Sequence, residues 1–300
     1  MRVNPFYVSN LVSSLDQAQV TEQQLSAEVS SGVRFTSLGD DPVSAGRNVM
    51  LLNQIQKDDS FTQSSSLVTG QLQVADSALG GVVTQLMQAL SLATSANNGT
   101  MNSDDVKSIS SQISGILSEV ESLANTAYQG QYVFGGGQTG TVPFTTSTAS
   151  SPGVTTYNGD SNINYLHTPN GQKIQLNVPG DTIFTASGTS SVFGALNALV
   201  ADYAQGTVNP AQAEADTAAL NSALKWLSQQ RVTIDNSITQ LAAASGAVTN
   251  EKTQLTAAQT DLMQADMAKV ATQLSLTKTQ QAALEAIISQ LGSGSLFDKL

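Results

Sequence analysis

Apolar side chains recur at alternating steps of three and four residues over the last third of the chain, from Leu220 to Leu291. This spacing forms a single apolar stripe along an α-helix, like the seam of a coiled coil, and it predicts one unbroken helix that needs a partner along the stripe. At about 1.5 Å per residue, roughly seventy residues extend on the order of 100 Å, which exceeds the width of a compact domain of this chain's length. The pattern therefore predicts an elongated rod.

Four polar residues interrupt the stripe: Arg231, Ser245, Lys252 and Gln259. Polar residues in a seam lower its stability and fix its register and its choice of partner. We expect each side chain either to pair with a partner or to extend its polar end to solvent. A seam interrupted in this way needs additional contacts from elsewhere in the chain, from other molecules or from both.

The same spacing occurs near the N-terminus and predicts a helix over residues 8–31, which Gly32 ends. Because both ends of the chain carry seams, we expect this helix to pair with the stretch near 255–291, so that the two termini lie at the same end of the rod. Glu22 occupies a seam position. It either faces one of the two basic residues of the C-terminal seam or is exposed.

Gly, Asp and Pro are too frequent in residues 31–46 for a helix. Pro42 suits the first turn of the helix that follows, and Asp40 or Asp41 can cap that helix by accepting hydrogen bonds from its first N–H groups. A metal site at the two acids is a weak alternative, because consecutive side chains diverge and no third ligand has a suitable spacing.

A helical hairpin is predicted next. Helical periodicity covers 49–93 and 106–127, a turn is expected at 98–99, and Ser103 or Asp104 is a candidate cap for the second helix. Together with the C-terminal helix, the hairpin predicts a three-helix bundle.

Between residues 128 and 209 the composition shifts to Gly, Thr, Ser, Asn and Pro, and short runs alternate Val, Ile, Tyr or Thr with polar residues. These runs predict short strands, with a hairpin turn at 169–171. The chain therefore leaves the bundle, forms a small β-rich domain and returns.

One short helix is expected within this region, over 192–204, because its apolar residues share one face and Ser190 or Ser191 can cap it. Asn209 and Pro210 suit the cap and first residue of the returning helix. The predicted fold class is mainly α with an inserted β-rich domain, built as an elongated rod of long antiparallel helices whose N- and C-terminal helices pair as a coiled coil. The predicted segments are an N-terminal assembly helix and turn (1–45), a helical hairpin (46–128), a β-rich outer domain (129–209), a returning bundle helix (210–254) and a C-terminal assembly helix (255–300).

The composition argues against several kinds of partner and site. A net charge of −11 argues against nucleic acid or an anionic membrane as the main partner, and the chain has no cysteine for disulfides, thiolate metal sites or nucleophiles. The N-terminus lacks the features of a cleaved signal peptide, and no window approaches eighteen apolar residues. We expect a protein that is either cytoplasmic or exported without a cleaved leader.

The chain offers no convincing catalytic chemistry. Residues 135–140 fit the G-x-G-x-x-G pattern of dinucleotide-binding proteins, but no helix can follow them, so their glycines more simply let the chain turn. His167 is the only histidine, which favours a surface role over a zinc site or triad. The acidic pairs at 58–59 and 104–105 suit a solvated face and a helix cap, and Trp226 suits a place in the bundle. We predict no catalytic residue, no metal and no cofactor, and we expect the protein not to be an enzyme.

Two segments resemble the conserved ends of bacterial flagellins. Residues 25–46, LSAEVSSGVRFTSLGDDPVSAG, resemble the N-terminal signature of that superfamily, and residues 260–286 resemble its C-terminal helix. In the second segment the matching residues are Asp261, Ala265, Asp266, Ala268, Leu274 and Gln280. Residues 130–144, 157–160 and 295–300 further resemble the branch that joins hook to filament.

The resemblance implies a structural protein of the bacterial flagellum, exported unfolded by the flagellar type III apparatus with an export chaperone and located at the hook–filament junction. It implies self-association in a ring or helical lattice between an adjoining hook-associated protein and flagellin, with no nucleic acid or membrane partner. A filament-forming flagellin is the alternative. By resemblance, the coiled-coil contacts are Leu11, Leu15, Leu25, Leu274, Leu284 and Ile288. The residues that shape the turn are Gly32, Arg34, Asp40, Asp41 and Pro42, and we expect Arg34 to pair with one of the two acids.

Overall fold

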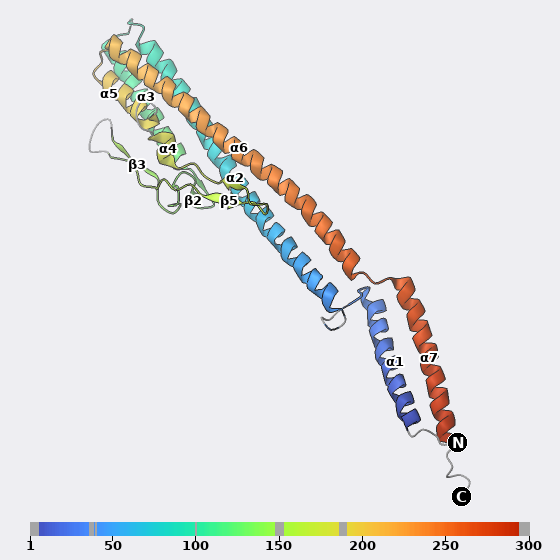
Figure 1. Cartoon of the computed structure of the whole chain (residues 1–300). Helices are drawn as coiled ribbons and strands as arrows, with labels where there is room; N and C mark the ends of the chain where they lie inside the picture. Colours follow the sequence, from blue (N-terminus) through green and yellow to red (C-terminus); the bar gives the residue numbers. More distant parts are fainter. Residues whose placement is uncertain are drawn as a thin grey trace. The chain divides into compact units, whose positions relative to one another are not determined.

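The computed structural model describes residues 6–35, 39, 41–99, 101–147, 153–185 and 191–293, and most of these residues are helical (Figure 1). The helices are α1 (Phe6–Ser31), α2 (Pro42–Ala96), α3 (Ser103–Ala124), α4 (Gly180–Phe184), α5 (Val192–Ala204), α6 (Pro210–Met263) and α7 (Met267–Ser293). The strands are β1 (Ala127–Tyr128), β2 (Gln131–Tyr132), β3 (Phe144–Thr146), β4 (Thr155–Tyr157), β5 (Tyr165–His167) and β6 (Lys173–Gln175). The predicted fold class, mainly α with an inserted β-rich part, is confirmed.

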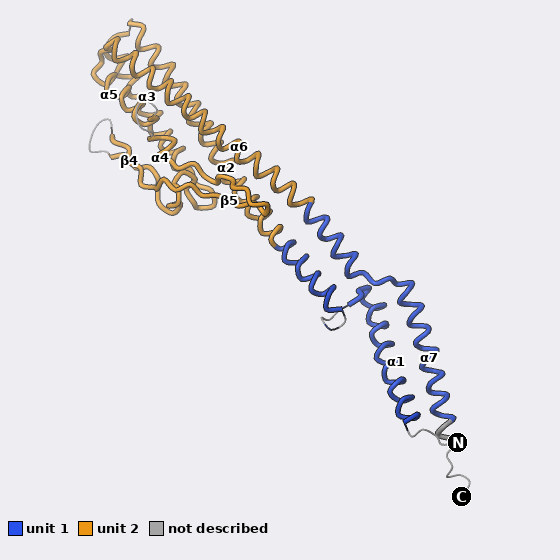
Figure 2. The backbone as a smooth tube through the Cα atoms, viewed as in Figure 1, with its two compact units in different colours: residues 1–56, 251–300 blue, residues 57–250 orange. Residues whose placement is uncertain are grey.

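The chain forms two compact units (Figure 2). Unit 1 contains residues 1–56 and 251–300, the two ends of the sequence, and unit 2 contains residues 57–250. The boundaries between the units fall within α2 and α6.

The core of unit 2 is formed by the apolar faces of α2, α3 and α6, as the seams predict. Its fully buried residues include Leu79, Leu86, Ile113, Leu220 and Leu227. The structure adds a fourth helix to the predicted three-helix bundle, because α5 packs against α3 and buries Leu196 and Leu199 in the same core.

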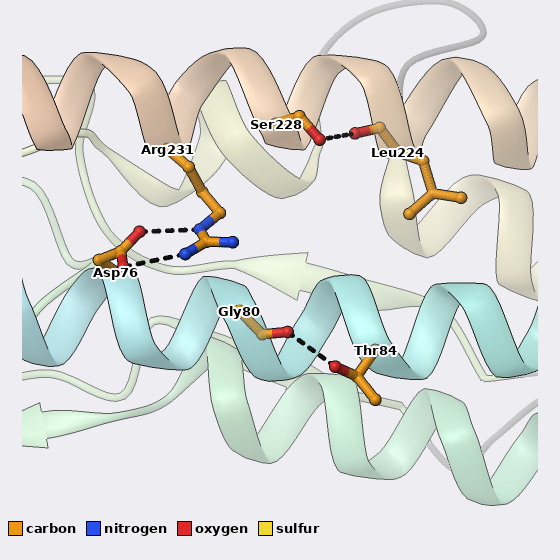
Figure 3. Close-up of polar contacts among 6 residues, drawn as sticks. All are labelled: Asp76, Gly80, Thr84, Leu224, Ser228 and Arg231. Carbon is orange, nitrogen blue, oxygen red and sulfur yellow. Dashed lines mark hydrogen bonds and ion pairs between the residues drawn. The ribbon is translucent and has the colours of Figure 1, made fainter.

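Arg231 shows how a polar seam residue is accommodated. Its Nε donates to Asp76 Oδ1 at 2.8 Å and its second guanidinium nitrogen to Asp76 Oδ2 at 3.0 Å, so one bidentate ion pair joins α6 to α2 (Figure 3). The hydrogen bond to Asp76 raises the pKa of Arg231 above its ordinary value. Of the two outcomes expected for this residue, pairing with a partner is confirmed.

Three short antiparallel hairpins make up the β-rich part of unit 2: β1 with β2, β3 with β4, and β5 with β6. The turn predicted at 169–171 connects β5 and β6, and Gly171 has a φ of +83°, which favours glycine. Aromatic rings join the hairpins to the short helices. Phe144 of β3 contacts Phe184 of α4 and Phe193 of α5, with ring centroids 5.2 Å apart in both pairs.

The glycine-rich segment 135–140 wraps around a carboxylate. Asp160 Oδ1 accepts hydrogen bonds from Gly137 N at 2.6 Å and Asn162 N at 3.1 Å, and these bonds lower the pKa of Asp160. Gly136 has a φ of +68°, and a Cβ at this position would lie 2.1 Å from the backbone oxygen of Asp160. No helix follows this segment, so its glycines form a turn, as predicted.

Most predicted helix boundaries are confirmed by their hydrogen bonds. The side-chain oxygen of Ser191 accepts from Gly194 N at the start of α5, and that of Asn209 accepts from Ala211 N at the start of α6. The alternative cap Ser190 lies outside the described residues. At the start of α3 the predicted cap, Ser103 or Asp104, was wrong. The cap is Asn102, whose side-chain oxygen accepts hydrogen bonds from the backbone N–H groups of residues 104 and 105.

Three expectations about helix faces and lengths were wrong. Asp58, expected on a solvated face, is buried because it lies on the inward stripe of α2, one turn before buried Phe61. Glu22 does not meet a basic residue of α6, because α1 lies against α7, and its carboxylate is 3.8 Å from Lys278 Nζ. The C-terminal helix is also not continuous, since residues 264–266 separate α6 from α7.

Candidate assembly interface

The two ends of the chain lie side by side in unit 1, where α1 packs antiparallel against α7 (Figure 1). Leu25 of α1 forms an apolar cluster with Ala265 and Val270, and Leu274 packs against that cluster. The cluster has only these few members. It therefore holds the helices together along a narrow strip and leaves most of their circumference uncovered.

Of the six predicted interface residues, only Leu25 and Leu274 are brought together in this cluster. Leu11 is also buried, while Leu15, Leu284 and Ile288 are half-buried. Ala265 and Val270 are cluster members that the predicted interface set omitted, although Val270 occupied a seam position in the sequence.

A backbone connection fixes where α1 ends relative to the start of α7. Arg34 N donates to Met263 O at 2.7 Å, Ala265 N donates to Gly32 O at 3.0 Å, and Val33 forms an antiparallel bridge with Gln264. Gly32 has a φ of +69°, the left-handed conformation expected of a residue that ends a helix. The break between α6 and α7 therefore lets residues 263–265 pair with residues 32–34, which follow α1.

Asp266 is the last residue of this break and directly precedes α7. Its Oδ1 accepts hydrogen bonds from Ala268 N and Lys269 N, both at 3.1 Å, which is the geometry of a helix N-cap. In the sequence, Asp266 itself was the signal for this break, because an aspartate is a common helix cap. The heptad spacing continues across Asp266 and therefore hid the signal.

The predicted turn is held by Arg34, Asp41 and Ser44. A guanidinium nitrogen of Arg34 donates to Asp41 Oδ2 at 2.8 Å and to Ser44 Oγ at 2.6 Å, and Ser44 N donates to Asp41 Oδ1 at 3.0 Å. Hydrogen bonds from the Ser44 side chain and backbone lower the pKa of Asp41, and Arg34 adds to the effect. The expected pairing of Arg34 with an acid is confirmed for Asp41, and Pro42 is the first residue of α2. Asp40 lies outside the described residues.

Unit 1 holds most of the large apolar side chains that the described residues leave exposed. On α1 they are Phe6, Tyr7, Val8, Val12, Val20 and Val29, on α2 Val43, Val49, Met50 and Leu52, and on α7 Met267, Leu276 and Ile287. Exposed apolar surface at this density is typical of protein interaction sites.

One cavity of about 410 Å³ opens within unit 1 between α2 and α6. It is lined by Arg47, Met50, Leu51, Gln54, Ala258 and Leu262. Beside it, the seam residue Gln259 donates to Asn48 Oδ1 at 2.9 Å, so this polar position also finds a partner within the chain.

The other residues that could have served in catalysis or metal binding are described next. Among the described residues, no group of three or more acids or histidines is arranged to hold a metal ion. His167 is exposed on β5, and the indole N–H of Trp226 donates to Thr182 O at 2.7 Å, which joins α6 to α4. Over the same described ranges, no helix is long and apolar enough to cross a membrane.

Comparison with known families found a match in the N-terminal part of the chain. Residues 6–139 match the family described as the bacterial flagellin N-terminal helical region, the stretch that begins with α1 and runs past α3. The resemblance to the flagellin superfamily is therefore confirmed.

The relatives that match individually are named as hook-associated proteins. Flagellar hook-associated protein 3 of Salmonella typhimurium is 29% identical over 148 residues, which cover 49% of this chain and 46% of that protein. This chain spans less than half of the length of the two curated relatives that it matches.

Solved structures share the fold. A Vibrio parahaemolyticus protein, provisionally described as flagellar hook-associated, has a TM-score of 0.67 at 19% identity over 75% of this chain and 100% of its own. Flagellar hook-associated protein 3 of Legionella pneumophila has a TM-score of 0.62 at 14% identity over 71% of this chain and 98% of its own.

Proposed function

We propose that this protein is a structural subunit of the bacterial flagellum that joins the hook to the filament. The observation that carries the proposal is the exposed apolar surface of unit 1, where the apolar cluster between the two ends of the chain is small. The helices of unit 1 leave that surface uncovered, so neighbouring subunits are needed to bury it. The names of the Salmonella and Escherichia coli relatives, flagellar hook-associated protein 3, support the place of assembly.

In the proposed assembly, α1 and α7 pair as a coiled coil along the two seams. The contacts that they use are Leu11, Leu15, Leu25, Leu274, Leu284 and Ile288, and Gly32, Arg34, Asp40, Asp41 and Pro42 shape the turn into the bundle. Copies associate through different surfaces on each subunit, because such heterologous contacts generate rings or helical lattices. The rod predicted from the seam length stays a prediction.

The assembly segments at the two ends are 1–45 and 255–300, and the bundle segments are 46–128 and 210–254, with 129–209 facing outward. The neighbours are an adjoining hook-associated protein on one side and flagellin on the other. We further propose that the chain is exported unfolded by the flagellar type III apparatus with the help of a chaperone, which suits a sequence without cysteine. The role is structural and not enzymatic.

A filament-forming flagellin is the second candidate, and the family match to the flagellin N-terminal region favours it. Labelled antibody on isolated flagella separates the two. A junction protein gives a narrow band beside the hook, whereas a filament subunit is labelled along the whole filament.

Deletion of residues 1–25 tests the assembly mechanism, because it removes most of α1 and leaves unit 2 complete. We expect a soluble protein whose α3 amides stay protected from hydrogen exchange but which no longer enters flagella. Full-length protein carrying Val154→Ser, at a residue of unit 2 that is 62% exposed, is the matched control and should assemble normally. Retained assembly of the deletion variant would contradict the proposal.

A further inference from the structure

Two acidic side chains meet in unit 2 where α5 ends and α6 begins. Asp202 is near the last residue of α5, and Asp216 is in the second turn of α6, where it is only 3% exposed. The Asp202 carboxyl is the neighbouring acid that acts on the carboxyl of Asp216. Gln212 Nε2 donates to Asp216 Oδ1 at 3.1 Å. The Oδ2 atoms of both aspartates are buried, and neither accepts a hydrogen bond from any described residue.

The surrounding helices supply no cation to this pair. The hydroxyl of Tyr203 on α5 donates to Asn97 Oδ1 at the end of α2, at 2.9 Å. The side chain of Lys107 on α3 lies against Gly206 in the connecting loop. A Cβ atom added to Gly206 would be 2.8 Å from the Cε of Lys107. Among the described residues, neither Asp202 nor Asp216 forms an ion pair.

Two ionised carboxylates in this position would repel each other and would lack the hydration that exposed carboxylates keep. A single proton removes both difficulties, because the protonated oxygen becomes a donor to the other carboxylate. We propose that Asp202 and Asp216 form a proton-binding site, in which one shared proton holds the end of α5 to the start of α6. Loss of the proton weakens this corner of unit 2 and makes its stability depend on pH.

The electrostatics of the site agree with its geometry. The pKa of Asp216 is raised from 3.8 to about 6, chiefly by burial and next by the hydrogen bond with Asp202, while the hydrogen bond from Gln212 lowers it. Because the pKa is higher in the folded than in the unfolded chain, the folded state holds the proton more tightly. Stability is therefore lost as the pH rises from about 4 through about 6, and it changes little above pH 7.

Unfolding of the full chain at several pH values tests the site, with the fluorescence of Trp226 as a reporter of unit 2, since this is the only tryptophan. In the Asp216→Asn variant an amide N–H takes the place of the shared proton at every pH. Relative to this variant, the unfolding constant of the wild-type protein should rise about 20-fold between pH 4.5 and 7.5. Asp202→Asn should remove the same dependence, and it serves as the second variant in case the first fails to fold.

Glu214→Gln is the matched control, because it removes one negative charge from an exposed position of the same helix turn and should follow the wild type. An equal pH dependence in the wild type and both asparagine variants would overturn the proposal. Stabilisation of the wild type by calcium chloride at pH 7.5, absent in Asp216→Asn, would also overturn it, because the pair would then be a cation site.

Discussion

The pairing of the two chain ends depends on Leu25, and replacing this residue by alanine tests how strongly they are held. Leu25 is 7% exposed and is the α1 member of the apolar cluster with Ala265 and Val270 of the C-terminal segment. Alanine favours the helix at least as much as leucine does, so the substitution leaves α1 itself intact and removes only contacts between the helices.

Leu→Ala substitutions at buried positions cost about 2–5 kcal/mol, and the cost is smallest where the site can collapse or reach solvent. The cluster around Leu25 is small and lies between only two helices, so we expect a cost at the low end, about 2 kcal/mol. A loss of that size raises the opening equilibrium of the helix pair roughly 30-fold, since about 1.4 kcal/mol corresponds to a factor of ten.

Hydrogen exchange of the full chain, followed by mass spectrometry, measures this opening. Amides of both α1 and α7 should exchange roughly 30-fold faster in the Leu25→Ala variant, whereas α3 in unit 2 should be unchanged. Val20→Ala is the control, because Val20 lies on the same helix and is 64% exposed. Unchanged exchange in α7, or an equal effect of the control, would refute the inference that this cluster holds the two ends together.

Two further substitutions test local features. Asp266→Ala should cost about 1 kcal/mol by removing the cap of α7, seen as faster exchange in the first turn of that helix, while Asp261→Ala, at an exposed position near the end of α6, should not. Gly136→Ala should destabilise unit 2 by at least about 2 kcal/mol in denaturant unfolding, because the positive φ and the close approach of Asp160 both oppose a Cβ. Gly140→Ala, where a Cβ would meet nothing within 4 Å, should have little effect, and equal costs at the two glycines would contradict this explanation.

Features encoded by neighbouring residues could be predicted from the sequence. The start of α6 followed from Asn209 and Pro210, and the ion pair of Arg34 with Asp41 followed from their shared turn. In each case the partners are separated by only a few residues, so the local chain geometry already brings them together.

Features that depend on distant partners could not be predicted in the same way. The pairing of Arg231 with Asp76, and of Glu22 with Lys278, depends on which helices pack together and in which register. The break before Asp266 was hidden because the heptad spacing continues across it, while the competing backbone bonds come from residues 32–34. The same holds for the small cluster in unit 1, whose member Ala265 lies in the break between α6 and α7.

We propose that this protein occupies the boundary between hook and filament and is held there by the paired ends of its chain. Immunogold labelling of flagella from cells that produce the protein tests it most directly, with the full chain and the variant lacking residues 1–25 compared side by side. We predict one narrow band next to the hook for the full chain and no band for the variant. Labelling along the whole filament, or an undiminished band without residues 1–25, would contradict the account.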